Sequence, residues 1–343
     1  MRAVIAHAAK DLRVEEAAVP GLGPRDVRVR IAFGGICGSD LHYYNHGGFG
    51  TVRLREPMIL GHEVAGVVEA VGAEVERVRP GARVAVNPSR PCNHCRYCLE
   101  GKQNHCLDMR FYGSAMRFPH VQGAFREVLV CDEAQAEPVA EGVSLGEAAM
   151  AEPLAVCLHA ARRAGELLGS RVLVTGAGPI GALCILAARR AGAAEIVATD
   201  IADAALGFAK KAGADRTINT LSDRDALSGF SKDKGHFDVL FEASGAEAAL
   251  RSALEVVRPG GVLVQLGLGG EMTLPVNTIT AKELQLRGTF RFHEEFALAV
   301  LLIGKGLIDV KPLISATLPF ADAREAFELA GDRSRSMKVQ LQF

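Results

Sequence analysis

The sequence predicts two domains, one rich in β-strands and one an α/β domain with a doubly wound parallel sheet. Residues 1–150 contain short apolar runs of β character that glycine and proline interrupt. From Arg171 onward, strands alternate with helices, which implies βαβ units and a parallel sheet. A chain of 343 residues is also longer than one ordinary core requires, so two domains are expected.

The predicted elements follow in chain order. Strands are expected at 27–33, 64–72 and 82–88, and apolar residues at helical spacing predict a helix within 144–165. The α/β part reads RVLVTG, PIGALCILAARRAG, AEIVATD, DAALGFAKKAG, FDVLFEASG, AEAALRSALEVVRPGG and VLVQLGL. An apolar helix at 296–304 and a terminal strand, KVQLQF, form a tail that we expect to return to the first domain.

Composition excludes several classes of partner. The formal net charge of −1 and the pI of about 6.8 argue against nucleic acid or an anionic membrane surface. No apolar run approaches the ~18 residues that span a bilayer. The start, MRAVIAHAAKDLRVEE, has no cleavage-like tail, so we expect a cytoplasmic protein. Its eight cysteines are then expected to be metal ligands or buried thiols.

The segment VLVTGAGPIG has the pattern of a dinucleotide-binding turn. Gly176 permits the tight turn, Gly178 lets the backbone approach a pyrophosphate, and Gly181 lets the following helix pack on the sheet. Asp200 ends the next strand, where it would accept ribose hydroxyls and repel a 2′-phosphate, so NAD is preferred over NADP. A glycine turn without a nucleotide is the alternative. Further candidate cofactor contacts are Pro179, Ile180, Ser244, Gly245, Leu266, Gly267 and Leu268.

Four cysteines within 15 residues predict a closed, structural zinc site. Cys92, Cys95, Cys98 and Cys106 form C-x2-C-x2-C-x7-C, which can surround one tetrahedral zinc ion. The alternative is an iron–sulfur cluster, but the bacterial ferredoxin pattern continues with three residues and Cys-Pro. His94 and His105 are interpreted as bystanders on this lobe.

A second set of possible ligands is spread along the chain. Cys37, His62, Glu63 and Glu152 lie in GGICGSD, GHEVAG and AEPLAV. A zinc site with few soft ligands keeps a position free for water or substrate. Each residue alone also fits a structural role, and the sequence does not prove that they meet. Three further cysteines are interpreted as buried thiols: Cys131, Cys157 and Cys184.

Together these motifs resemble the zinc-containing medium-chain dehydrogenase/reductase family. GGICGSDLHYY, LGHEVAG, the four-cysteine lobe, AEPLAV and GAGPIG occur in that family's order. Glu152 stands where the alcohol dehydrogenases carry a cysteine ligand, which makes the chain similar to the sorbitol (polyol) branch. Within this branch, 108–125, 288–296 and the ending AGDRSRSMKVQLQF resemble the L-idonate 5-dehydrogenase family.

The resemblance implies a GroES-like β-barrel catalytic domain, formed by 1–150 and 293–343, that is split around a Rossmann domain at 151–292. A structural-zinc lobe would occupy about 88–108. The implied reaction is reversible NAD(P)-linked oxidation of the C5 hydroxyl of L-idonate to 5-keto-D-gluconate. The resemblance also implies two zinc ions per chain and a homo-oligomer, either a dimer or a tetramer. Alternatives are a sorbitol- or xylitol-type polyol dehydrogenase, a threonine dehydrogenase and a non-catalytic nucleotide-binding protein.

The resemblance also implies roles for individual residues. Ser39 and His42 would relay the proton released by the substrate, and Arg291 would bind the aldonate carboxylate, with Arg110, Arg117 and His120 as rivals. Whether Glu63 or Glu152 ligates zinc directly is left open. The remaining implied contacts are Tyr43, Glu152, Arg291 and Phe292 to substrate, and Thr289, Phe290 and Arg291 to the cofactor.

Overall fold

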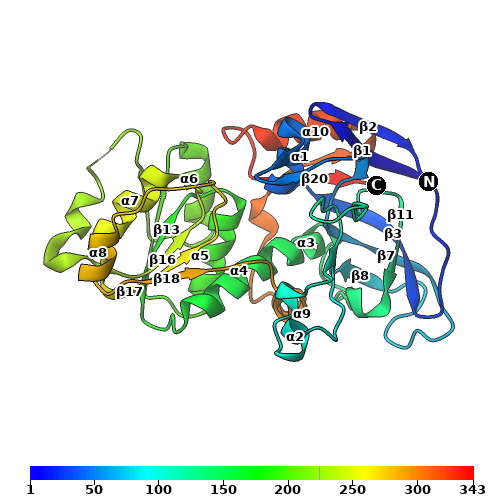
Figure 1. The fold of residues 1–343 in the computed structure, drawn as a ribbon, viewed down its shortest axis with the longest axis horizontal. Coiled ribbons are helices and arrows are strands. Elements are labelled where there is room, and N and C mark those ends of the chain that lie inside the picture. The colour runs from blue at the N-terminus through cyan, green and yellow to red at the C-terminus, as the bar shows by residue number, and fades with distance from the viewer. Residues whose placement is uncertain (224) are drawn as a thin grey trace. The chain divides into compact units, whose positions relative to one another are not determined.

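The computed structural model describes residues 1–223 and 225–343, and these form two compact units (Figure 1). Unit 1 contains Met1–Glu152, Phe292–Asp332 and Lys338–Phe343, and unit 2 contains Pro153–Arg291 and Arg333–Met337. The sequence-based boundaries fell at 150/151 and 292/293, and the short Arg333–Met337 segment was not foreseen. Within the described residues, no helix combines the length and apolar character needed to cross a membrane.

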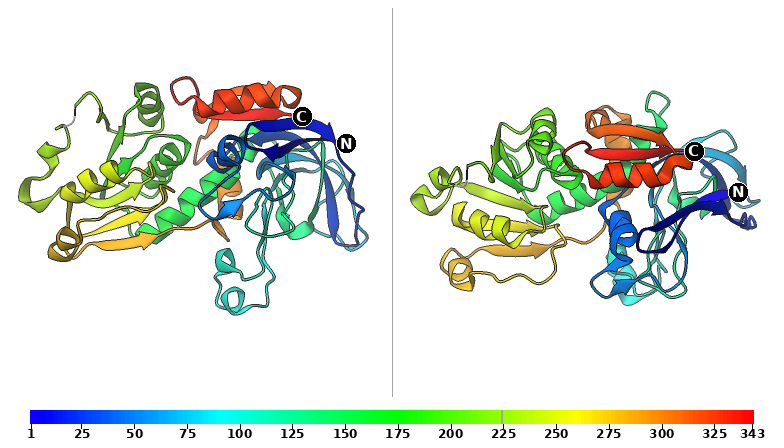
Figure 2. Two further views of the ribbon diagram at one scale, coloured as in Figure 1. Left: turned by 45° about the horizontal axis from the view of Figure 1, so that its top comes forward. Right: turned by 90° about the horizontal axis from the view of Figure 1, so that it is seen from above.

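Unit 2 is built on a six-stranded parallel sheet in the order β15-β14-β13-β16-β17-β18. In chain order this is 3-2-1-4-5-6, the arrangement of a Rossmann domain. Figure 2 shows α7 and α8 on one side of the strands and α5 and α6 on the other. The unit comprises β13 (Arg171–Thr175), α5 (Pro179–Arg190), β14 (Glu195–Asp200), α6 (Asp203–Lys211), β15 (Arg216–Asn219), β16 (Phe237–Glu242), α7 (Glu247–Val256), β17 (Val257–Gln265), α8 (Val276–Ala281) and β18 (Gln285–Gly288).

The strand order fixes where unit 2 can bind a ligand. The order in which successive strands are added reverses between β13 and β16, and ligands of such sheets bind outside the carboxyl ends of the strands at that point. The GAGPIG turn follows β13, and Ser244 and Gly245 follow β16. The topology therefore brings two of the predicted cofactor segments to one edge.

Unit 1 has the predicted β-rich character. Its two main sheets are β2-β1-β6 and a seven-stranded sheet, β12-β8-β7-β3-β20-β19, in which β11 also pairs with β3. Its strands are β1 (Arg2–Ala8), β2 (Asp11–Glu16), β3 (Asp26–Gly35), β4 (Gly48–Phe49), β5 (Val52–Arg53), β6 (Met58–Ile59), β7 (Glu63–Val71), β8 (Arg83–Val86), β9 (Ser89–Arg90), β10 (Arg110–Phe111), β11 (Val128–Asp132), β12 (Ala136–Pro138), β19 (Ile314–Pro319) and β20 (Lys338–Gln342).

The C-terminal tail returns to unit 1, as its sequence predicted. Strand β20 pairs antiparallel with β3, with Gln340 opposite Gly35, and its apolar side chains join the core formed by β3, β7 and β8. The predicted 144–165 helix is divided at Met150. The helices outside the Rossmann sheet are α1 (Gly38–His46), α2 (Arg96–Leu99), α3 (Leu145–Ala149), α4 (Ala151–Ala164), α9 (Glu295–Gly304) and α10 (Ala323–Gly331).

Candidate metal centre and cofactor edge

Three of the four dispersed candidate ligands converge in unit 1. Cys37 precedes α1 as its N-cap, and His62 and Glu63 lie at the start of β7. One ligand atom from each of these three residues lies within 4.8 Å of the others. Because β3 leads directly into α1 and pairs with β7, the register of these strands brings Cys37 beside His62 and Glu63.

Asp40, which the sequence analysis did not single out, joins the two ligand segments. Its fully buried carboxylate accepts N–H groups from Cys37 and Gly61, each at 3.0 Å. The same carboxylate lies 3.8 Å from Nδ1 of His62, a buried nitrogen without a hydrogen-bond partner in the described structure. A carboxylate behind a histidine orients that ring toward a metal. The available signal was an acidic residue three positions after the N-cap.

Glu63 is held by a lysine from the far end of the chain. Nζ of Lys338 lies 2.8 and 2.7 Å from the two carboxylate oxygens of Glu63, and it also donates to the carbonyl of Ile36. Both charged side chains are almost fully buried. Burial lowers the pKa of Lys338, but the charge and hydrogen bond of Glu63 and the charges of Cys37 and Glu152 together outweigh burial, so the net shift is upward. No sequence motif predicted this pair.

Glu152 is buried at the start of α4 and interacts electrostatically with the same cluster. Burial raises its pKa to about 8, with the charges of Glu63 and Cys37 adding to the rise and His62 opposing it. Burial likewise raises the pKa of the Cys37 thiol to about 11. Burial therefore favours the neutral forms of both groups. A thiol, an imidazole and carboxylates fit a zinc ion, whose positive charge would favour their ionised forms.

The walls of this centre come from α1 and the 108–125 segment. The Phe111 ring centre lies 5.5 Å from that of His62, a contact the sequence analysis missed. Ser39 and His42 are half-buried on α1, and the His42 ring lies 5.7 Å from that of Phe49. The buried Tyr43 hydroxyl accepts the N–H of Ala115 at 3.0 Å, so Tyr43 anchors the 108–125 segment to α1.

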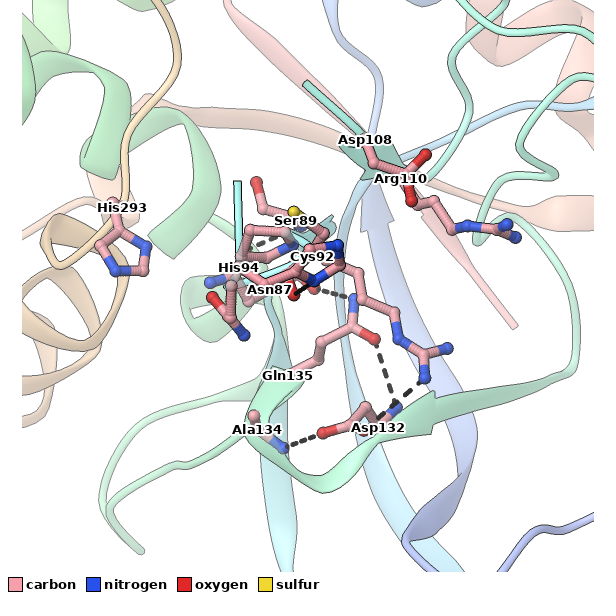
Figure 3. A pocket seen from close by; sticks show the side chains of 13 residues that line it. Asn87, Ser89, Cys92, His94, Asp108, Arg110, Asp132, Ala134, Gln135 and His293 are labelled. Atoms are coloured by element: carbon pink, nitrogen blue, oxygen red, sulfur yellow. Dashed lines mark hydrogen bonds and ion pairs between the residues drawn. The ribbon is translucent and has the colours of Figure 1, made fainter. Parts of the chain in front are cut away.

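Two of the rival carboxylate partners have structural contacts. The guanidinium of Arg117 pairs with Asp108. His120 is buried, and its Nε2 accepts the N–H of Arg55 at 2.9 Å while its Nδ1 lies 2.8 Å from the Arg117 carbonyl oxygen. Arg110 lines a cavity of about 610 Å³ beside the cysteine lobe (Figure 3). Arg90 also lines this cavity, and its guanidinium lies 3.8 Å from the Asp132 carboxylate.

The four cysteines of the lobe converge, with one sulfur atom from each within 4.8 Å of the others. Backbone amides point at these sulfurs: Cys106 Sγ accepts the N–H groups of Cys92 at 3.1 Å and Asp108 at 3.3 Å. Amide hydrogen bonds lower the pKa of Cys95 to about 6, and burial raises that of Cys98 to about 12. Four thiols with amide donors around them fit a closed zinc site. Neither His94 nor His105 belongs to this group of four.

In unit 2 the glycine turn has the geometry its sequence predicted. Gly176 adopts φ +82°, and a side chain at Gly181 would overlap the Gly176 carbonyl. At Gly178, by contrast, an added Cβ would meet open space at the N-terminus of α5. The N–H groups at that helix end are therefore open to a pyrophosphate.

The carboxylate of Asp200 lies beside the glycine turn. It accepts the N–H of Ala177 at 2.7 Å and that of Ala202 at 2.9 Å, which fixes it at the end of β14. At the end of β18, the hydroxyl of Thr289 is an unpartnered buried donor in the described structure. Both observations fit a dinucleotide along this edge.

Arg291 and Phe292 occupy different environments. Arg291 has φ +54°, and its guanidinium stacks over the Phe290 ring at 4.9 Å. Phe292 is buried in unit 1 and stacks on Phe296, with the ring centres 5.8 Å apart. The structure thus places the Phe292 ring in packing contact with α9.

A catalytic-type metal cluster, a four-thiol lobe and a Rossmann sheet define a zinc-dependent dehydrogenase. Residues 23–141 match the family model for the alcohol dehydrogenase GroES-like domain, and residues 179–304 match the zinc-binding dehydrogenase model. The chain belongs to this family of zinc-binding alcohol dehydrogenases.

Individual members of this family are similar to the chain over almost its whole length. The chain is 46% identical over 316 residues to L-idonate 5-dehydrogenase (NAD(P)(+)) of Escherichia coli K12, covering 92% of this chain and 91% of the relative. The crystal structure of the E. coli L-idonate 5-dehydrogenase superposes with a TM-score of 0.96 at 44% identity, covering 100% of this chain and 98% of that one. A probable D-xylulose reductase A of Aspergillus fumigatus is 38% identical over 325 residues, which cover 92% of this chain and 90% of the relative.

Proposed function

We propose that the chain is an NAD(P)-linked, zinc-dependent dehydrogenase that oxidises the C5 hydroxyl of L-idonate to 5-keto-D-gluconate, reversibly. The observation that carries this proposal is the 46% identity over almost the whole chain to an enzyme of that activity. The converged metal cluster and the open glycine turn support it, because both parts of the machinery are present.

Cys37, His62 and Glu63 would hold the catalytic zinc, with Glu152 beside them, and the four lobe cysteines would hold the second zinc. This choice rests on the mutual proximity of the first three groups, among which Glu152 is not found. A zinc ion bound there would supply Lewis acidity toward a substrate hydroxyl, and a bound nicotinamide would supply the hydride acceptor. Asp40 would keep the His62 ring oriented toward the metal while the reaction proceeds.

Ser39 and His42 would carry the released proton away from the site. Both lie half-buried on α1, the helix that Cys37 begins, so they can connect the metal centre with solvent. A serine hydroxyl donates and accepts together, and a histidine titrates near neutral pH. Tyr43 and Phe292, proposed as substrate contacts from the resemblance, would act chiefly by shaping the wall, because both rings are buried.

Arg291 would bind the carboxylate that distinguishes an aldonate from a polyol. Its guanidinium fork suits a carboxylate, and the rivals Arg117 and His120 are engaged in structural contacts. Asp200 would favour NAD over NADP by accepting ribose hydroxyls, although both cofactors can serve. We further propose a cytoplasmic enzyme that works as a dimer or tetramer.

A substrate and cofactor screen tests this function. NADH or NADPH release is measured with L-idonate, D-gluconate, sorbitol, xylitol and threonine. The expected result is the highest kcat/KM with L-idonate and NAD. A higher value with sorbitol or xylitol would support the polyol alternative, which the likeness to a probable D-xylulose reductase favours. No turnover of any alcohol by zinc-loaded protein would contradict both.

A further inference from the structure

Glu242 is a buried carboxylate in unit 2 that is not part of the dinucleotide-binding glycine turn and has no role in the proposed reaction. It ends β16, has 0% exposed surface, and no lysine or arginine in the described structure pairs with it. An ionised carboxylate buried without a cation must be compensated by hydrogen-bond donors. Those donors identify what the residue does.

The donors come from three strand ends. Glu242 Oε1 accepts the N–H of Ser244 at 2.9 Å, the Ser244 hydroxyl, the N–H of Gly245 at 3.1 Å and the hydroxyl of Thr175 at 3.4 Å. Oε2 accepts the Gly245 N–H at 3.1 Å and Nε2 of Gln265 at 2.7 Å. Thr175 ends β13, Ser244 and Gly245 follow β16, and Gln265 ends β17. One carboxylate therefore ties together the carboxyl ends of three adjacent strands.

These strand ends touch the glycine turn directly. A Cβ on Gly176 would lie 2.6 Å from the backbone nitrogen of Ser244, so the first glycine of the turn is packed against the segment that Glu242 holds. A side chain on Gly267 would likewise overlap Gly245 and the Glu242 carboxylate. The backbone segments are too close for side chains to separate them. The Glu242 carboxylate accepts the N–H groups of Ser244 and Gly245, and its backbone carbonyl accepts that of Gly267.

We infer that Glu242 is a positioning residue for the dinucleotide: it fixes the β13, β16 and β17 ends in the arrangement that binds the cofactor. It acts through Ser244, Gly245 and Gln265 and need not touch the cofactor itself. The inference rests on the proposed function, which supplies the dinucleotide. It adds a determinant of cofactor affinity that lies beneath the binding edge.

The test measures the binding of NADH to the zinc-loaded, full-length protein by fluorescence titration. Glu242→Gln replaces one acceptor oxygen with an amide donor that would face N–H groups. We expect the Kd for NADH to rise about tenfold, as loss of a buried, charge-assisted hydrogen bond predicts. KM for NAD should rise in parallel, while KM for the sugar acid should remain unchanged.

Asp238→Asn is the matched control. Asp238 lies on the same strand at the opposite end, where it accepts the N–H of Arg171 at 2.7 Å, away from the cofactor edge. It should weaken the same sheet without changing the Kd for NADH. Gln265→Leu, which removes one donor to Glu242, should raise the Kd about threefold and serves if Glu242→Gln is insoluble.

Two results would overturn the inference. One is an NADH affinity of Glu242→Gln (or Gln265→Leu in its place) within about 1.5-fold of the wild-type value. The other is an equal loss of NADH affinity in Asp238→Asn, which would reduce the effect to sheet stability. Failure of the wild-type protein to bind NADH would instead contradict the proposed function, so the two failures are distinguishable.

Discussion

The ammonium group of Lys338 lies 2.7 and 2.8 Å from the two carboxylate oxygens of Glu63, although 275 positions separate the residues in the chain. The pair connects the last strand of the protein to its candidate metal centre. Lys338 also donates to the carbonyl of Ile36, next to Cys37. The C-terminal strand therefore contributes to the charge balance of the site as well as to the sheet.

Lys338→Met should destabilise the protein by about 3–5 kcal/mol, because it leaves Glu63 buried without its cation. Urea unfolding measures the change, with the wild type and both variants compared without the catalytic zinc, because Glu63→Gln is itself expected to lose that metal. The double variant Glu63→Gln/Lys338→Met should recover part of the loss, since the unpaired charge is then removed. Equal stability of the single and double variants would show that the ion pair is not the source of the effect.

Glu63→Gln and Glu152→Gln should differ in zinc content. If Cys37, His62 and Glu63 hold the catalytic metal, Glu63→Gln should fall from two zinc ions per chain to one. Glu152→Gln should keep both and lose about 10–100-fold in kcat/KM, as expected for a group that supports a metal without ligating it. Metal analysis measures the zinc content of each variant, and steady-state kinetics measure its kcat/KM. Loss of zinc from Glu152→Gln would place Glu152 among the ligands.

Cys98→Ser should remove the lobe zinc and leave the catalytic one. Four thiolates close the site, so three cannot complete the tetrahedron without an external ligand. The measurements are zinc per chain, expected to fall from two to one, and the midpoint of thermal unfolding, expected to decrease. Cys131→Ser is the control because Cys131 is buried outside both clusters and should leave the zinc content at two.

Asp200→Ala should raise the ratio of kcat/KM for NADP to that for NAD by about tenfold, since the charge that repels a 2′-phosphate is lost. Asp200→Asn is the matched control for charge, because an amide oxygen can still accept the N–H of Ala177. Both variants should shift the ratio in the same direction. An unchanged ratio in both would refute this role of Asp200.

Asp238 should contribute acid-sensitive stability to unit 2. Burial alone raises its pKa, but hydrogen bonds from Arg258 and Arg171 outweigh burial and lower it to about 2. A carboxyl with a lowered pKa stabilises the fold above its unfolded pKa of about 3.9, and this contribution is lost as the pH falls toward 2.

The corresponding variant is Asp238→Asn. It should lower the free energy of unfolding by about 2 kcal/mol at pH 7 and by progressively less as the pH falls from 4 to about 2. Urea unfolding at several pH values provides the measurement. A cost that stays constant across this range would contradict the assigned titration.

The sequence by itself determined the parts of the protein whose function depends on local chain geometry. The glycine turn was readable because Gly176 needs a positive φ and Gly181 has no room for a side chain, and both constraints act within a few residues. The cysteine lobe was readable for the same reason, since its four ligands lie within 15 residues. Alternating strands and helices likewise predicted the parallel sheet.

Only the tertiary structure decided which distant residues meet. Strand pairing brings Cys37 to His62 and Glu63, and it places Lys338 on Glu63 from the other end of the chain. Asp40 and Glu242 were missed because each also binds donors that are distant in the chain, namely Gly61 for Asp40 and Thr175 and Gln265 for Glu242. A buried charge is recognised by the partners that compensate it, and no residue pattern along the chain contains those partners.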